Sequence, residues 1–304
     1  QNRNFSAARS DIAIRIRDFR LNGFFDWKTG TSNRFDPYVR LRTGGQFDFF
    51  KREFKLIDST YIDTLTRIQR LLAWRPFVYE GSYVPFNVRF ELETADQNPS
   101  LFDRYWDGAT FTGDQSLRNQ SVFLAKAQAQ FTGEPGVNKG LPYLQNQYRL
   151  GFSLGRLGRP WYYTDDFTVQ QAPQGEGVVY TGLHAYIRQR IWRLYFENQT
   201  TYLLQSATGG GPDELVGYLP NLYGTARLSY RNRIFRKAAD VSIGLEAHYR
   251  TDYDGYQYAL ATQAFYPLAG FDPGNYVRID AFITARITKA MLFFRLVHLN
   301  EGFW

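Results

Sequence analysis

Apolar and polar residues alternate along most of this chain, and this period of two constrains the fold more than any other feature. In the segment from Asn275 to Ile287, NYVRIDAFITARI, every second residue from Val277 onward is apolar. The residues between them are polar or charged, with the exception of Phe282. Because successive side chains of a β-strand point to opposite faces, the segment predicts a strand with one apolar and one charged face.

The same alternation recurs along the chain, and its length is informative. Most of the alternating segments are ~9–15 residues long, whereas strands in soluble proteins average about 5–6. A barrel strand that crosses a bilayer at a tilt needs about 9–11. Strand length therefore favours a membrane barrel over a soluble sheet. The other segments are Val39–Phe49, Phe86–Glu93, Phe123–Phe131, Leu144–Leu154, Val179–Arg188, Trp192–Gln205, Leu222–Arg231 and Ala239–Arg250.

Alternation by itself does not say which face points inward. In a soluble sandwich the apolar face is the core, whereas in an outer-membrane barrel it meets lipid and the charged face lines the lumen. Serial alanines such as Ala125, Ala127 and Ala129 suit a lipid face, which needs no close packing. Tyr and Trp near strand ends suit the membrane interface. We therefore predict an all-β transmembrane antiparallel up-and-down barrel of about 12 strands (range about 12–16).

The connections test this topology, since bacterial barrels have short turns at one end and longer loops at the other. With Ile12–Phe25 taken as one strand, the count is about eleven, and an even number requires one more. We therefore expect residues 1–304 to form a single barrel domain whose closing strand is missing after Trp304. The stretch from Ile57 to Gly81 is long for a turn, so either it holds another pair of strands or residues are missing there. Short connections are expected at Gln189-Arg190, Asn232–Arg236 and Thr288-Lys289, and long ones at Asp96–Arg118, Leu157–Gly175, Ser206–Leu219 and Thr251–Gly274.

The composition argues against several function classes. Cysteine is absent, so thiol chemistry is excluded. Of the three histidines, His184 and His248 fall on strands that are not neighbours, so we expect no metal site and no cofactor. Ser242 and His248 share a strand face but lie roughly 20 Å apart, so we predict no catalytic residues and no enzyme. The net charge of +7 comes from scattered residues, so we expect no nucleic-acid partner.

Three segments carry a resemblance to a known family. They are SYRNRIFRKAADVSIGLEAHYRTDYDGYQY from Ser229, GNYVRIDAFITARITKAMLFFRLVHLNEGF from Gly274, and LFDRYWDGATFTGDQSLRNQ from Leu101. In these basic hairpins and aromatic-rich stretches the chain resembles the putative outer-membrane porin family of Bacteroidota. The resemblance implies an outer-membrane location and a pore, and it transfers no catalytic residues. That family continues into a further strand with an aromatic end, which this chain lacks.

Each face of the predicted strands has its own candidate residues. The pore-lining candidates are charged, and arginine is in excess among them. They are Arg89, Glu91, Lys126, Arg149, Arg188, Arg193, Glu197, Arg227, Arg231, Glu246, Arg278, Asp280 and Arg286. The lipid-facing candidates are apolar. They are Phe123, Ala125, Leu150, Phe152, Val241, Ile243, Leu245, Ile279 and Ile283.

Two functions fit these faces. Rings of charge in a hydrated lumen would make a channel for passive diffusion of small solutes, with a bias toward anions. Alternatively, cross-strand ion pairs would fill a narrow lumen, and the barrel would be a non-conducting scaffold or partner subunit of a larger cell-envelope complex. Arg278 and Asp280, two residues apart on one face, illustrate the second possibility because they compensate each other. The expected partners are outer-membrane lipids and, in the second case, other envelope proteins.

Overall fold

The computed structural model is all-β. Among the residues that it describes there is no helix, and so none long and apolar enough to cross a membrane. The described residues are 3–16, 19–32, 35–57, 78–99, 113–133, 135–138, 141–144, 146–164, 168–210, 216–234, 239–259, 264–267, 274–287 and 290–301.

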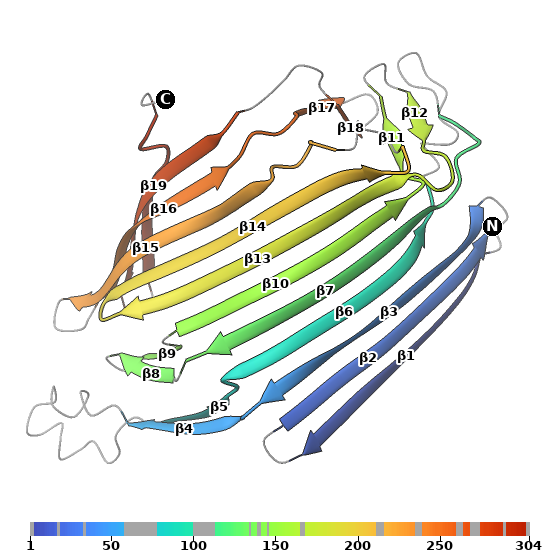
Figure 1. Cartoon of the computed structure of the whole chain (residues 1–304). Helices are drawn as coiled ribbons and strands as arrows, with labels where there is room; N and C mark the ends of the chain where they lie inside the picture. Colours follow the sequence, from blue (N-terminus) through green and yellow to red (C-terminus); the bar gives the residue numbers. More distant parts are fainter. Residues whose placement is uncertain are drawn as a thin grey trace, which may run out of the picture.

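A single antiparallel sheet of twelve strands contains most of these residues, and its strands lie side by side in chain order (Figure 1). This confirms the predicted up-and-down meander of twelve strands. The strands are β1 (Arg3–Ile16), β2 (Phe19–Ser32), β3 (Phe35–Phe49), β6 (Phe86–Gln97), β7 (Gln120–Thr132), β10 (Asn146–Gly158), β13 (Gly177–Ile191), β14 (Leu194–Thr208), β15 (Leu222–Ile234), β16 (Ala239–Arg250), β19 (Tyr276–Ile287) and β20 (Ala290–Leu296).

The sheet is curved like the wall of a porin-type barrel, but it is not closed. Strand β1 pairs only with β2 and strand β20 only with β19, so the described sheet has two edges (Figure 1). Beyond β20 the chain continues along β19: the amide of Leu299 donates to the carbonyl of Ile279 at 2.7 Å. This segment covers part of the β19 edge that the shorter β20 does not reach.

The N-terminal region differs from the expectation. The sequence predicted one strand over Ile12–Phe25, whereas the structure has a hairpin in which Ile16 of β1 faces Phe19 of β2. The even-numbered positions of β1 are on the same face as the odd-numbered positions of β2, so the alternation changes phase at this turn. The single-strand prediction is therefore wrong, and the twelfth strand lies here.

Four short hairpins lie outside the main sheet. At one end are β4 (Arg52–Ile57) with β5 (Val78–Tyr83) and β8 (Pro135–Asn138) with β9 (Leu141–Leu144); at the other are β11 (Trp161–Tyr163) with β12 (Val169–Gln171) and β17 (Tyr256–Ala259) with β18 (Ala264–Pro267) (Figure 1). The last hairpin confirms that 251–274 is an excursion and not a membrane strand. The hairpin β4–β5 flanks the stretch from Ile57 to Gly81 and adds no strand to the main sheet; residues 58–77, where a further pair of strands was considered, lie outside the described residues.

From β10 onward the connections follow the predicted alternation of short and long. At the N-terminal end they do not, because two short connections, β1–β2 and β2–β3, follow each other. The turn between β13 and β14 is also displaced. Strands β13 and β14 are joined by Trp192 and Arg193, so the turn lies three residues later than the predicted Gln189-Arg190. Trp192 has a φ of 56°, in the left-handed region where glycine or asparagine is usual. The turn was misplaced because its sequence contains neither residue.

The two faces of the sheet differ in crowding as well as in chemistry. The face with Ile243, Leu150 and Ile283 leaves these apolar side chains 44–64% exposed. On the opposite face polar side chains are buried, for example Ser229 at 2% and Asp280 at 0%. Because side chains converge on the concave side of a curved sheet, we call the polar face the inner face and the apolar face the outer face. Among the described residues few large apolar side chains are buried, and within this part of the chain no protein core covers the outer face.

Candidate functional site: the charged inner face

Cross-strand register assembles the charges of the inner face. In an antiparallel sheet, residues directly opposite each other share a face. One such row runs across five neighbouring strands from β13 to β19 and alternates in sign at first. Its members are Arg188, Glu197, Arg227, Glu246 and Asp280. The row therefore brings together residues that are far apart in the sequence.

The structure places the predicted pore-lining residues on this face, with one exception. Register puts Arg89, Glu91, Lys126, Arg149, Arg188, Glu197, Arg227, Arg231, Glu246, Arg278, Asp280 and Arg286 on the inner face. The predicted lipid-facing residues share the outer face: Phe123, Ala125, Leu150, Phe152, Val241, Ile243, Leu245, Ile279 and Ile283. Whether these faces meet water and lipid stays a prediction.

The exception is Arg193, which belongs to the turn between β13 and β14 and not to a strand. Its guanidinium donates to the hydroxyl of Tyr230 at 3.1 Å and lies over the ring of Trp192, 4.7 Å from the centroid. Tyr230 faces Leu194 on the outer side of the sheet. Arg193 therefore stands beside aromatic rings at the strand ends, because the turn falls later than the sequence suggested.

Several carboxylates of the inner face are paired with arginines. Glu197 accepts from Arg188 at 3.1 Å and lies 3.7 Å from Arg231. On the N-terminal half of the sheet, Arg42 pairs with Glu91 at 2.7 Å, and Arg40 donates to Glu93 at 2.8 Å. These pairs join neighbouring strands and fix their register.

Asp280 has the most contacts of these carboxylates and is fully buried. It accepts from Nε of Arg295 at 3.1 Å and from the backbone amide of His298 at 3.1 Å. Arg278 lies 3.4 Å away, which confirms the compensation expected from their spacing. Arg295 also donates to Glu246 at 3.0 Å. The cluster therefore ties β16 and β19 to β20 and to the segment beyond it.

Phe282 is the one apolar residue that interrupts the charged face of its strand, and the structure gives it a role. Its ring lies over Gly244 on β16, where a Cβ atom would stand 2.8 Å from Cζ. The guanidinium carbon of Arg227 lies 4.0 Å from the ring centroid. The ring of Phe282 thus lies between Gly244 on one side and the Arg227 guanidinium on the other, and we call it the platform of Arg227. The alternation along β19 alone does not reveal this arrangement.

Three inner-face arginines, Arg149, Arg227 and Arg250, share an unusual environment, and we call them the stacked arginines. Each guanidinium lies over an aromatic ring, that of Tyr186 at 5.0 Å, Phe282 at 4.0 Å and Tyr276 at 5.1 Å, respectively. Their Nε atoms are buried and have no hydrogen-bond partner within the described part of the chain. None of the three forms an ion pair with a described carboxylate, in contrast to the arginines above.

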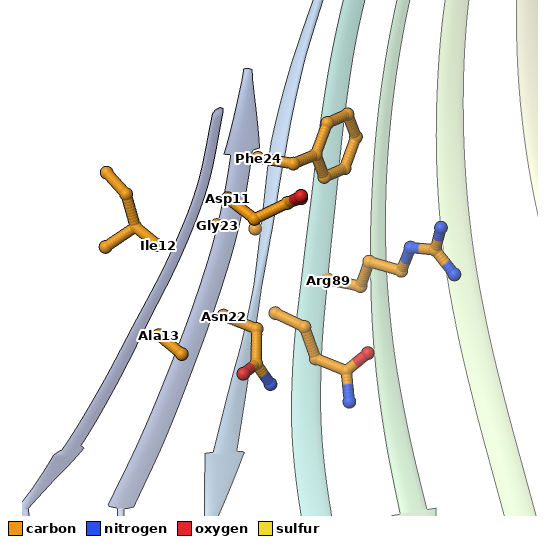
Figure 2. Close-up of a pocket in the computed structure, with 9 residues that line it drawn as sticks. Asp11, Ile12, Ala13, Asn22, Gly23, Phe24 and Arg89 are labelled. Carbon is orange, nitrogen blue, oxygen red and sulfur yellow. The ribbon is translucent and has the colours of Figure 1, made fainter. Parts of the chain in front are cut away.

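A hollow of about 410 Å³ lies against strands β1 to β3 and β6, and Figure 2 shows the residues around it. Asp11, Phe24 and Arg89 point to one side of the sheet, whereas Ile12 points away from them (Figure 2). A smaller hollow of about 250 Å³ shares Arg89 with it and is also lined by Glu91 and Lys126. At its N-terminal half the inner face therefore offers positive charges, negative charges and side-chain amides.

His184 has a hydrogen-bonded neighbour on each side, which the sequence did not reveal. Its Nε2 is 2.9 Å from the hydroxyl of Ser153 and its Nδ1 is 3.1 Å from the hydroxyl of Thr201. A threonine stands where a carboxylate would orient a catalytic histidine. In the described ranges, no three His, Cys, Asp or Glu residues are grouped so that they could hold a metal ion. The triplet is best described as a polar bridge across three strands.

A tyrosine pair joins the excursion between β16 and β19 to the loop between β14 and β15. The rings of Tyr218 and Tyr256 have centroids 4.5 Å apart. Burial, with a smaller effect of Tyr218 and Tyr180, raises the pKa of Tyr256 to about 12. The hairpin β17–β18 is thus held against the loop before β15 by aromatic contact.

No curated protein matches the chain. The profile of a family described as "Putative porin" matches residues 83–304, which include nine of the twelve strands of the main sheet, β6 to β20. That match agrees with the long antiparallel strands, the apolar outer face and the charged inner face. The chain therefore belongs to the putative porin family.

Proposed function

We propose that this chain is a non-enzymatic, porin-like channel of a bacterial outer membrane, through which small solutes diffuse passively. In this proposal the chain forms a single barrel domain, the outer face meets outer-membrane lipids, and the inner face lines a lumen with an excess of arginine. The resemblance to porins of Bacteroidota supports a source with an outer membrane.

The observation that carries the proposal is the separation of the two faces. Large apolar side chains on the outer face are exposed across the sheet, among them Leu150, Ile243 and Ile283. An exposed apolar surface of this extent is rare on soluble monomers, whereas a band of outward apolar residues is the normal surface of a membrane barrel. The inner face is polar and charged, as in water-filled barrels.

Single-channel recording tests the proposal. The full-length protein, purified in detergent, would be added to a planar lipid bilayer in potassium chloride. We expect discrete conductance steps that are absent when protein unfolded by boiling is added. A folded protein that inserts but produces no steps would overturn the channel function.

A second candidate function follows from the ion pairs. Asp280, Glu246 and Arg295 form a compact cluster over β16, β19 and β20, and such networks can fill a narrow lumen. A barrel filled in this way would serve as a scaffold or partner subunit of a cell-envelope complex. This candidate function predicts no conductance steps in the bilayer recording. It also predicts that a stable envelope partner co-purifies with the chain after mild detergent extraction.

A further inference from the structure

Arg227 is a cation whose expected partners are already engaged. It lies directly opposite Glu197 on one side and Glu246 on the other. Glu197, however, pairs with Arg188 at 3.1 Å and Arg231 at 3.7 Å, and Glu246 accepts from Arg295 at 3.0 Å. Arg227 has no ion pair of its own within the described residues, although carboxylates flank it in register.

The aromatic platform holds Arg227 in a fixed orientation. Phe282 is only 7% exposed, and its ring lies 4.0 Å below the guanidinium carbon. Stacking uses the flat face of a guanidinium and leaves its N–H groups free at the edge. The Nε atom of Arg227 is buried and has no hydrogen-bond partner among the described residues. Because the buried Nε is out of reach of a solute, the donors that remain for a ligand are the two terminal amino groups of the guanidinium, which the ring holds in place.

A second glycine–ring–arginine stack, at the N-terminal side of the sheet, includes a carboxylate that the Arg227 stack lacks. Phe24 lies over Gly44, with its Cε1 atom 2.9 Å from where a Cβ would stand, and Arg42 lies over the Phe24 ring at 5.3 Å. There the guanidinium donates to Glu91 at 2.7 Å. The two stacks are alike in their glycine, ring and arginine, but only the Arg42 stack contains its carboxylate.

We propose that Arg227 on its Phe282 platform is a binding site for a small oxyanion, the phosphate or carboxylate group of a passing solute. The absent partner would be supplied by the solute, whose two oxygens fit the donor fork of a guanidinium. This inference rests on the proposed channel function for the statement that the solute passes, but the binding itself does not require conduction.

The other stacked arginines extend the site into a series. Along β15 the inner-face positions Tyr223, Thr225 and Arg227 follow one another, about 7 Å apart at each step. Arg250 is in the row of Tyr223 and Arg149 is in the row of Thr225. Successive rows therefore each hold one stacked arginine, on β15, β16 and β10, so that the inner face presents cations without ion-pair partners at three levels.

Binding of inorganic phosphate tests the site directly. Titration calorimetry on the folded full-length protein in detergent would compare wild type with Arg227→Gln. A hydrogen-bonded charge pair of this kind predicts that the substitution weakens phosphate binding by about tenfold or more. The matched control is Arg156→Gln, which removes the same charge from an exposed outer-face position beside Val179 and Phe123 and is expected to leave the affinity unchanged.

Two further variants separate the site from a general charge effect. Arg227→Lys keeps the charge but loses the planar fork, so we expect binding between that of wild type and Arg227→Gln. Phe282→Leu keeps the arginine and removes its platform, and it should also weaken binding. Equal affinity in wild type and Arg227→Gln, or equal losses in Arg227→Gln and Arg156→Gln, would overturn the inference. Should Arg227→Gln fail to fold, Arg227→Lys with wild-type affinity would overturn it.

Ion selectivity distinguishes this inference from the proposed function. In a potassium chloride gradient, wild-type channels should have a reversal potential that indicates preference for chloride, and Arg227→Gln should reduce that preference. Phosphate binding without any conductance would reject the channel and keep the binding site. Conductance with no dependence of phosphate affinity on Arg227 would reject the site and keep the channel.

Discussion

The ring of Phe282 lies directly over Gly244: a Cβ atom on that glycine would stand 2.8 Å from Cζ of the ring. The same Cβ would also overlap the carbonyl oxygen of Leu228 and come within 2.9 Å of Cα of Ser229. The absence of a side chain on β16 therefore allows both close strand approach and an aromatic ring on a charged face.

Gly244→Ala is accordingly expected to destabilise the folded barrel by about 1–3 kcal/mol, the usual cost of overpacking. Two of the atoms that the new methyl would meet belong to the backbone, which cannot move aside as a side chain can. Urea unfolding in detergent micelles, followed by intrinsic fluorescence, would measure the change.

The control for this prediction is Gly151→Ala on the same inner face. There the nearest atoms, the carbonyl oxygen of Ala127 and Cβ of His184, are both 3.6 Å from the added carbon, an ordinary contact. Unfolding midpoints that shift equally in both variants would show that the platform over Gly244 is not the cause.

Asp280→Asn is expected to cost about 1–3 kcal/mol, because it removes the charged acceptor of several hydrogen bonds. The carboxylate is fully buried and accepts hydrogen bonds from Arg295 and from the amide of His298. In the variant the two arginines would be left without their shared counter-charge. The measurement is again the free energy of unfolding in detergent.

The comparison for Asp280 is Asp240→Asn on the neighbouring strand. Asp240 pairs with Arg286 at 3.4 Å, and the side chain of Arg286 is half exposed. Exposed pairs of this kind contribute about 0–1 kcal/mol. Equal losses in the free energy of unfolding for Asp280→Asn and Asp240→Asn would show that the cluster around Asp280 contributes no more to stability than an exposed ion pair does.

The faces of the strands were predictable from the sequence because side-chain direction depends only on the period of two. Ile279 and Ile283 could be assigned to one face, and Arg278 and Asp280 to the other, without knowledge of any partner strand. The change of phase between Ile16 and Phe19 was also visible in the sequence, and would have revealed the first hairpin had the apolar positions been followed residue by residue.

Cross-strand contacts were not predictable, because they depend on register between distant segments. The contact of Arg227 with Phe282 links residues of β15 and β19 across the intervening β16. Likewise Ser153, His184 and Thr201 meet only because three strands align. The turn at Trp192 contains no glycine, asparagine or aspartate to mark its position, whereas the turn at Thr288-Lys289 was predictable from the alternation on either side of it.

Ile283→Arg tests the outer face. Ile283 is 44% exposed on the apolar side of β19, and an arginine at the midplane of a bilayer costs about 2–4 kcal/mol. We expect a lower folding yield and lower stability in lipid vesicles. Thr284→Arg, one residue along on the inner face, should be far milder. Equal losses in the two variants would mean that the assignment of faces is wrong.

Tyr256 gives the outer hairpin a dependence on alkaline pH. Its pKa is raised from 10.0 to about 12 in the folded protein, so the stability linked to this group is complete below pH 10.0. It is lost as the pH rises toward about 12, because the unfolded chain ionises first. The stability difference between wild type and Tyr256→Phe should therefore change over this interval. Tyr258→Phe, in the same hairpin, serves as the control, and an identical profile in both variants would contradict the prediction.

Asn300 substitutes for a strand along the uncovered part of β19. Its side-chain amide donates to the carbonyl of Val277 at 2.6 Å, and its side-chain oxygen accepts from the amide of Ile279 at 2.9 Å. Asn300→Ala would leave both backbone groups without these partners, at a cost of about 1–3 kcal/mol for each one that stays buried.

Hydrogen exchange provides the sharpest measurement, since the amide of Ile279 is the group whose protection depends on the Asn300 oxygen. We expect faster exchange at Ile279 in Asn300→Ala. Asn300→Asp keeps the acceptor and loses the donor, so it should preserve the protection of Ile279 while still weakening the contact with Val277. Unchanged exchange at Ile279 in Asn300→Ala would show that the segment after β20 does not hold this edge.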